Sequence, residues 1–249
     1  MSDYSFLKWP FFEDEHRTLV VELEKWAKSE LIEYSSPTKV DTACRELVVK
    51  LAEAGWLDYS VTKNYGGKYL SLDVRSLCLI RETLSRFSGL ADFVFAMQGL
   101  GSGTISLFGS DELKEKYLPD VRNGKKIAAF ALTEPEAGSD AAALTTTAEQ
   151  DGDSFVLNGE KTLISNGGIA NYYTVFAKTG EAPGTRGIST FVIDADTAGL
   201  EISERIETIA PHPLARIRFN QVRIPKTQQI GAGGEGFKMA MATLDIFRS

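Results

Sequence analysis

The sequence predicts an α+β chain in which an all-helical part precedes an antiparallel β part and a further helix follows. Three observations support this. Apolar residues recur every three or four positions through residues 11–121, as on the buried face of amphipathic helices. From Ile127 the pattern changes to short strand-like runs separated by turn residues. After Pro225 a glycine-rich stretch leads into FKMAMATLDIFRS, which is helical again. We therefore expect domains at 1–126, 127–228 and 229–249.

The first part contains five predicted helices. The first has its apolar face at Phe12, His16, Leu19, Leu23, Trp26 and Ala27, and the second at Val40, Cys44, Leu47, Val48 and Leu51. Gly55 sits where a glycine commonly ends a helix. Segments 72–87 and 90–108 are the next two, and 90–108 is apolar almost all round, as expected of a buried central helix. Ser110 is the predicted N-cap of the fifth, and Pro119 its predicted end.

The β part is predicted from the runs IAAFALT, DSFVLNGEK, YYTVFAK, ISTFVID, LEISER and ARIRFNQV. Turn residues such as DGD, NG, NGG and DTAG lie between them. Asn158-Gly159 is the strongest hairpin signal in the chain. No helical pattern of ten residues interrupts these runs, so we expect an antiparallel barrel or sandwich and not a βαβ sheet.

The segment TEPEAGSD, residues 133–140, has two interpretations from its residues alone. It is either an acidic surface turn or a loop shaped to hold a ligand. Pro135 fixes its own φ, and Gly138 allows a φ that other residues resist. Such a loop can aim backbone N–H groups and hydroxyls at an acceptor-rich ligand.

The composition excludes several classes of function. The net charge of −7 disfavours nucleic-acid binding. Cys44 and Cys78 lack close spacing and indicate reduced thiols in a cytoplasmic protein. We expect no metal site, because His16 and His212 are far apart and no Cys/His ligand spacing appears. No secretory signal is evident, and no apolar run reaches the roughly 20 residues of a membrane span.

Six motifs in order resemble the acyl-CoA dehydrogenase family over nearly the whole chain. They are YGGKYLSL, LFGSDELKEKYLP with NGKK, FALTEPEAGSD, FVLNGEKTLISNGG, FVIDAD with VRIP, and GEGFKMAMATLDIFR. The resemblance implies that the helical and β domains form two sides of an FAD site. It also implies that the last helix begins a C-terminal helical-bundle domain, most of which is missing here.

The resemblance assigns roles to individual residues. Cofactor-binding residues are expected at Phe130, Leu132, Thr133, Gly138, Ser139, Leu163, Ile164 and Ser165. Leu163 departs from the family, which usually has an aromatic residue there. Substrate-binding residues are expected at Ser139, Asp245 and Arg248. The carboxylates of TEPEAGSD are expected to be scaffold, and the glycine-rich GAGGEG to be a hinge into the next helix.

The implied reaction is FAD-dependent α,β-dehydrogenation of an acyl-CoA to a 2-enoyl-CoA, with an electron-transfer flavoprotein as acceptor. The catalytic glutamate is expected after Ser249, because the alternative family position is occupied by Phe247. This chain alone is therefore expected to be inactive. Alternatives are a non-catalytic acyl-CoA- or flavin-binding subunit, or an acyl-CoA oxidase or flavin-dependent hydroxylase on the same fold. The resemblance further implies a homo-oligomer that takes part in the degradation of fatty or other carboxylic acids. It does not indicate which acyl chain the protein accepts.

Overall fold

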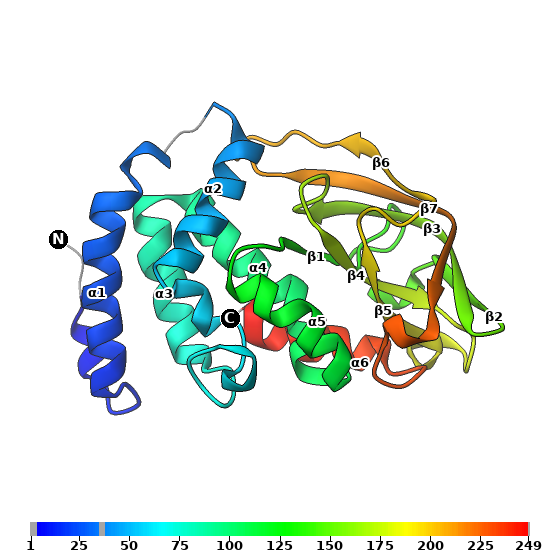
Figure 1. Cartoon of the computed structure of the whole chain (residues 1–249), viewed down its shortest axis with the longest axis horizontal. Helices are drawn as coiled ribbons and strands as arrows, with labels where there is room; N and C mark the ends of the chain where they lie inside the picture. Colours follow the sequence, from blue (N-terminus) through cyan, green and yellow to red (C-terminus); the bar gives the residue numbers. More distant parts are fainter. Residues whose placement is uncertain (1–3, 35–37, 249) are drawn as a thin grey trace.

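The computed structural model describes residues 4–34 and 38–248 and places a helical half beside a β half (Figure 1). Residues 1–3, 35–37 and 249 belong to the predicted domains but lie outside this description. The helices are α1 Asp14–Glu30, α2 Val40–Glu53, α3 Val74–Phe87, α4 Gly89–Phe108, α5 Asp111–Arg122 and α6 Gly236–Phe247. The strands are β1 Ala128–Ala131, β2 Thr147–Asp151, β3 Ser154–Ser165, β4 Tyr172–Lys178, β5 Ile188–Asp194, β6 Leu200–Arg205, β7 Leu214–Pro225 and β8 Gln229–Ile230. The predicted fold class is confirmed.

The predicted helices of the first half all form, and α4 is the buried central one. Gly55 follows α2 with a φ of 79°, the left-handed conformation that glycine adopts without a steric penalty. The Ser110 side chain accepts a hydrogen bond from the Leu113 amide and caps α5 as predicted. The predicted stop at Pro119 is wrong, because α5 continues to Arg122 with Pro119 inside it. Tertiary packing overrides the local preference here, since Leu118 and Val121 are both fully buried on either side of the proline.

The strands form one sheet in the order β6-β7-β3-β2-β4-β5-β8, and most neighbours run antiparallel. The short strand β1 lies off this path and pairs in parallel with β4, and β2 also meets β4 in parallel, at Thr147 and Lys178. The predicted hairpin at Asn158-Gly159 is wrong. Both residues lie inside the long strand β3, where the register against β7 shifts. Gly159 is needed there because a Cβ atom would stand 2.6 Å from the Thr146 hydroxyl oxygen.

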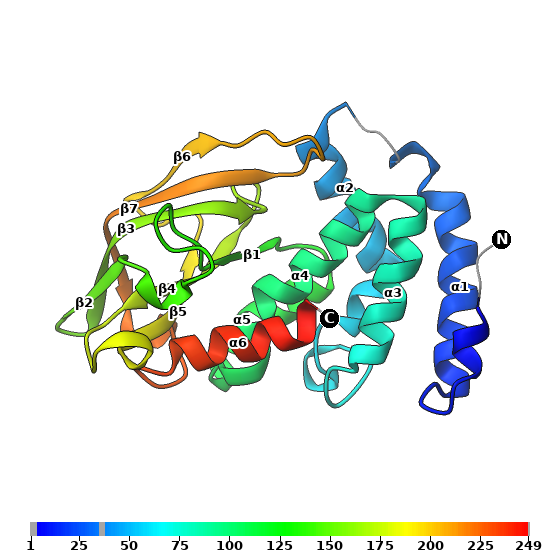
Figure 2. The same cartoon turned by 180° about the vertical axis from the view of Figure 1, so that it is seen from behind.

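Helix α6 returns from the β half and lies along α4, as both ribbon views show (Figure 2). The Phe247 ring occupies the groove that Gly99 and Gly103 leave on α4, and only 4% of Phe247 is exposed. Thr104 on α4 and Thr243 on α6 share a buried hydrogen bond of 3.0 Å between their hydroxyls. These contacts bring the end of the chain to the middle of the molecule.

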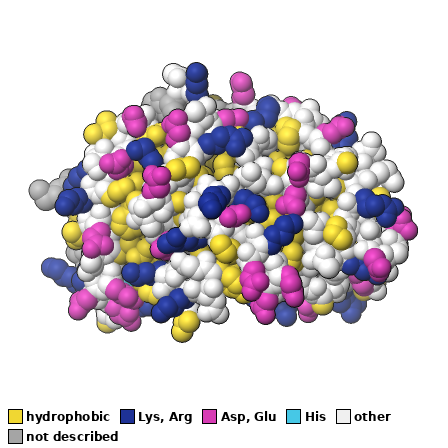
Figure 3. Space-filling model, viewed as in Figure 1, with side chains coloured by type: hydrophobic (Ala, Val, Ile, Leu, Met, Phe, Trp, Pro, Cys, Tyr) yellow, Lys and Arg dark blue, Asp and Glu magenta, His cyan; other side chains and the backbone are white. Residues whose placement is uncertain are grey.

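Acidic and basic side chains are interspersed on the face shown in Figure 3. The described helices also include none that is both long and apolar enough to cross a membrane.

Asp73 ties the start of α3 to α1. Its carboxylate accepts hydrogen bonds from the Ser76 amide (3.0 Å) and hydroxyl (2.7 Å), and it lies 2.9 Å from Nε2 of the buried His16. Burial opposes ionisation of Asp73, but the bonds from His16, Ser76 and Arg75 outweigh it, and its pKa falls to about 2.

We expect Asp73→Asn to lower the free energy of unfolding by about 2 kcal/mol at neutral pH. Because the folded pKa lies below the ordinary value of 3.8, this stabilisation is complete above that pH and is lost as the pH falls towards 2. Urea unfolding at several pH values should therefore show the two proteins converging in acid. Asp14→Asn is the control, since Asp14 is fully exposed, and its effect should stay within about 0.5 kcal/mol. A constant difference between wild type and Asp73→Asn at every pH would contradict the assignment.

Candidate functional site

Two segments predicted to share a site lie side by side. The Thr162 amide donates a 2.9 Å hydrogen bond to the Thr133 carbonyl. At the other end, the Asn166 side-chain amide donates a 2.8 Å bond to the Ala128 carbonyl. The stretch from Ala128 to Thr133 therefore runs antiparallel to 162–166. This brings Phe130, Leu132 and Thr133 next to Leu163, Ile164 and Ser165, although about thirty residues of sequence separate them.

Leu163 has an unusual conformation. Its φ is 55°, in the left-handed region that branched and bulky residues rarely adopt, and 55% of the residue is exposed. The register of β3 against β7 shifts between Lys161 and Ile164, and this irregularity turns Leu163 outwards while Ile164 is buried. An apolar side chain held out of the core in a strained conformation points to a ligand surface.

Thr133 and Ser165 belong to the same two segments, and each carries a hydroxyl group. Both residues are partly buried, and among the described residues neither side-chain hydroxyl has a hydrogen-bonding partner. Phe130 backs the segment, with its ring centroid 4.8 Å from that of Phe176. Leu132 is buried in the same apolar cluster. Exposed Leu163 with free hydroxyl groups nearby suits a flat ring that has polar atoms along its edge, which is the shape of a flavin.

The TEPEAGSD segment begins as a tight turn. Glu134 and Ala137 exchange backbone hydrogen bonds of 3.1 and 3.2 Å around Pro135. The expectation that Gly138 takes a φ that other residues resist is wrong, because its φ is not in the left-handed region. A Cβ atom there would also meet nothing within 4 Å. Gly138 and Ser139 are both exposed and reach no side chain of the 163–165 segment through a hydrogen bond, so their predicted cofactor contacts stay predictions.

Lys161 and Glu134 form a buried ion pair that the sequence analysis missed. The Lys161 ammonium lies 2.8 Å from Glu134 Oε1, and the two residues are 0% and 3% exposed. The same ammonium donates a 3.0 Å bond to the Leu132 carbonyl. The signal available was a lysine alternating with apolar residues inside a predicted strand, in FVLNGEKTLIS.

This pair keeps Glu134 ionised. Burial opposes its charge, but the Lys161 ammonium and the hydrogen bonds from Thr146 and Thr145 outweigh it, and the pKa of Glu134 falls to about 2. Burial lowers the pKa of Lys161 to about 8, against the attraction of Glu134. A carboxylate with so low a pKa and with its oxygens already hydrogen-bonded is a poor proton acceptor near neutral pH. Glu134 is therefore scaffold, as expected for the carboxylates of this segment.

The predicted substrate residues Asp245 and Arg248 lie at the end of α6. Both are exposed, and neither forms an ion pair with another described residue. Phe247 between them faces α4. The other side of α6 packs on the site, because Phe237, Met241 and Leu244 join the apolar cluster that contains Phe130 and Leu132. The catalytic carboxylate predicted after Ser249 falls outside the described residues.

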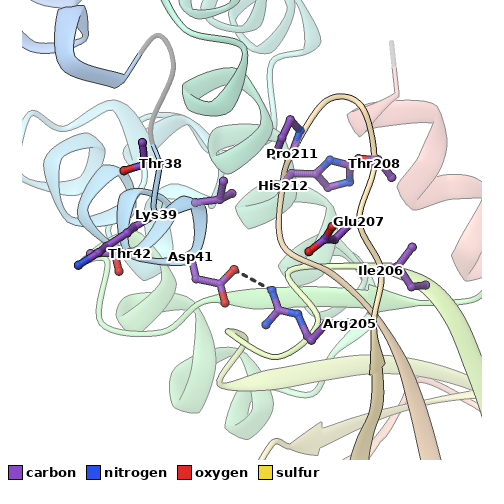
Figure 4. Close-up of a pocket in the computed structure, with 11 residues that line it drawn as sticks. Thr38, Lys39, Asp41, Thr42, Arg205, Ile206, Glu207, Thr208, Pro211 and His212 are labelled. Atoms are coloured by element: carbon purple, nitrogen blue, oxygen red, sulfur yellow. Dashed lines mark hydrogen bonds and ion pairs between the residues drawn. The ribbon is translucent and has the colours of Figure 1, made fainter.

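A separate cleft of about 660 Å³ lies between the start of α2 and the connection from β6 to β7 (Figure 4). Asp41 and Arg205 form a 2.7 Å ion pair across it. His212 lies at its edge, with its ring centroid 4.8 Å from that of Phe93. None of the predicted site residues lines this cleft, and sequence reasoning did not anticipate it.

A second group not anticipated from sequence is Glu13, Glu15 and His16, whose side-chain ligand atoms lie within 4.8 Å of one another. Both ring nitrogens of His16 are already used: Nδ1 accepts from the Glu13 amide and Nε2 pairs with Asp73. The imidazole therefore serves to cap α1 and to join it to α3.

Comparison with known proteins identifies two family domains in the chain. Residues 13–125 match the acyl-CoA dehydrogenase N-terminal domain, and residues 129–222 match the acyl-CoA dehydrogenase middle domain.

Among curated proteins, a 3-(aryl)acrylate reductase of Clostridium sporogenes is 36% identical over 96% of this chain and 64% of its own length. A probable acyl-CoA dehydrogenase of Mycobacterium leprae is 36% identical over 94% and 61%. The caffeyl-CoA reductase-Etf complex subunit CarC of Acetobacterium woodii is 36% identical over 82% and 54%. The chain thus spans about six tenths of the length of the first two relatives.

Solved structures of acyl-CoA dehydrogenases have the same fold as this chain. The acyl-CoA dehydrogenase of Bacillus anthracis complexed with FAD superimposes with a TM-score of 0.84 at 34% identity, covering 96% of this chain and 41% of that one. Butyryl-CoA dehydrogenase of Megasphaera elsdenii gives 0.83 at 30% identity, covering 95% and 63%.

Proposed function

We propose a function from the premise that this chain belongs to the acyl-CoA dehydrogenase family. We propose that it forms the helical and β walls of an FAD-dependent oxidoreductase that removes hydrogen from the α and β carbons of an acyl-CoA. The observation that carries the proposal is the surface formed by 130–133 and 163–165. There a strained, exposed Leu163 shares two adjoining segments with Thr133 and Ser165, whose hydroxyls have no hydrogen-bonding partner among the described residues.

These residues would hold the flavin in distinct ways. Leu163 would offer an apolar surface to the ring, and Thr133 and Ser165 would offer hydroxyl groups to its polar edge. Ser139, Asp245 and Arg248 are exposed and free to meet the acyl-CoA. FAD, when bound, would supply the acceptor for the β hydrogen and its electron pair, and the residues named here would supply orientation.

The base that removes the α-proton is proposed to lie outside residues 4–248. Glu134 is held by Lys161 and three hydrogen bonds from Thr145 and Thr146, so it has no free position from which to accept a proton. Position 247, the other carboxylate position expected from the family, carries a buried phenylalanine. We propose that residues 4–248 bind and orient, and that turnover needs a carboxylate from beyond them.

The electron partner is proposed to be an electron-transfer flavoprotein, because the Acetobacterium relative is a subunit of a complex with Etf. The reverse reaction, reduction of an enoyl substrate, is a second candidate. It is favoured by the two relatives whose names describe reductases, at 36% identity each. Electron source and substrate supply decide the direction, because one site catalyses a reaction both ways.

The test is an anaerobic titration of the flavin-loaded full-length protein, which includes the proposed carboxylate from beyond residues 4–248, with a panel of acyl-CoA thioesters, following the visible flavin absorbance. We expect at least one saturated acyl-CoA to bleach the flavin and the matching enoyl-CoA to restore it. Ser165→Ala should slow bleaching by about 10-fold or more while changing FAD affinity by less than about 3-fold, because the hydroxyl acts on orientation. A flavin that dithionite reduces but no thioester does would refute the proposed reaction. An unchanged rate in Ser165→Ala would refute only the role of Ser165.

A further inference from the structure

We infer that the Lys161–Glu134 pair is the positioning element of the candidate site. It sets the spacing between the two segments that face the ligand, Thr133 on one side and 163–165 on the other. This inference deepens the proposed function, since it concerns the same site.

The ammonium of Lys161 fixes one segment to the other. It donates to the carbonyl of Leu132 at 3.0 Å and contacts Glu134 Oε1 at 2.8 Å. These two acceptors belong to the residues immediately before and after Thr133. The Thr162 amide, next along the chain, donates to the Thr133 carbonyl. Residues 132, 133 and 134 are therefore each bonded to β3.

The carboxylate of Glu134 fixes the return of the loop. Its Oε2 accepts from the Thr145 amide at 2.6 Å and the Thr145 hydroxyl at 2.8 Å, and its Oε1 accepts from the Thr146 amide at 3.0 Å. Both ends of the 134–146 loop, which carries Ser139, therefore meet at one carboxylate. Thr146 continues directly into β2, which pairs with β3, so the loop is closed onto the strand that carries Leu163 and Ser165.

Stability alone does not account for a buried pair of this kind. The cost of removing both charges from water largely cancels their attraction, and apolar residues of similar volume often replace such pairs without loss. An apolar pair could not form the directed hydrogen bonds to the Leu132 carbonyl and to the Thr145 and Thr146 amides. The pair lies at the residues where the 132–134 and 161–163 segments meet, which is where a displacement of about 1 Å would alter ligand alignment most.

The test uses a double variant, Lys161→Met with Glu134→Gln, which removes both charges together and so avoids an unpaired buried one. Its two readouts are amide exchange of Thr162 without cofactor, and the FAD dissociation constant with the visible circular dichroism of the bound flavin. Asp73→Asn is the control, because it weakens partly buried hydrogen bonds in the helical half, away from this site.

We expect the double variant to remain folded and its Thr162 amide to exchange about 10-fold faster or more, relative to amides of the β4–β5 ladder. FAD should dissociate about 10-fold more readily, with a changed flavin dichroism, because the contact residues are misaligned. Asp73→Asn should change neither readout. Unchanged Thr162 exchange in the double variant would overturn the inference. Failure of the wild type to bind FAD would refute the proposed function instead, and the Thr162 measurement would still test the pair.

Discussion

Gly101→Ala is expected to destabilise the protein by about 3 kcal/mol, although glycine-to-alanine changes inside helices usually stabilise by about 1 kcal/mol. The reason is the contact between α4 and β1. A Cβ atom at residue 101 would lie 2.6 Å from the Ala128 Cβ and 2.7 Å from the Ala128 carbonyl carbon and the Ala129 nitrogen. Two of these atoms are backbone, so no side-chain rotation can relieve the overlap.

Gly89→Ala is the matched control, because Gly89 lies in the same helix and a Cβ atom there meets nothing within 4 Å. Guanidinium unfolding should place it within about 0.5 kcal/mol of the wild type. A Gly101→Ala protein as stable as Gly89→Ala would show that β1 can move away at no cost. Since β1 leads directly into Leu132 and Thr133, that result would also mean that the site wall is not rigid.

Local sequence patterns were sufficient for the elements whose preferences and packing agree. The helical period located α1 to α5, and the predicted turn at DGD lies between β2 and β3, with Gly152 at a positive φ, although β2 itself was not among the predicted strand runs. They failed where a distant contact decides. Asn158-Gly159 has hairpin chemistry, but Gly159 is required by close approach of Thr146, which no local window includes.

The site shows the same division. Motifs at 130–133 and 163–165 were sufficient to select the two segments, and the structure brings them together. The Lys161–Glu134 pair was missed because its residues are separated by 27 positions and each has an ordinary surface interpretation alone. The prediction that Gly138 takes a φ that other residues resist was wrong. A glycine in the sequence shows only which conformations the backbone can adopt, and here the backbone hydrogen bonds between Glu134 and Ala137 complete the turn before residue 138.

The glycines of α4 also have a reason that lies far along the chain. Two of them, Gly99 and Gly103, make the groove into which the Phe247 ring fits. An added Cβ at Gly99 would lie 2.2 Å from a ring carbon of Phe247, and one at Gly103 would lie 2.7 Å from another. The aromatic residue and the two glycines therefore form one packing unit, which holds α6 beside the site.

Phe247→Ala is consequently expected to cost about 3 to 5 kcal/mol, as for other buried phenylalanines, and to release α6. Hydrogen exchange should show faster exchange along α6, while the β4–β5 ladder stays protected.

The groove also predicts that the effects of substitutions at Gly99 and Phe247 on the unfolding free energy are coupled. Gly99→Ala should destabilise the wild type, where its methyl group meets the ring, and should be neutral or stabilising in Phe247→Ala, where it fills the vacated space. A double-mutant cycle of unfolding free energies measures this, and additive effects would refute the packing unit. Phe247→Glu would place a carboxyl group in the same groove. Because that space is apolar, we expect the carboxyl group either to stay protonated in the folded protein or to detach α6 from α4.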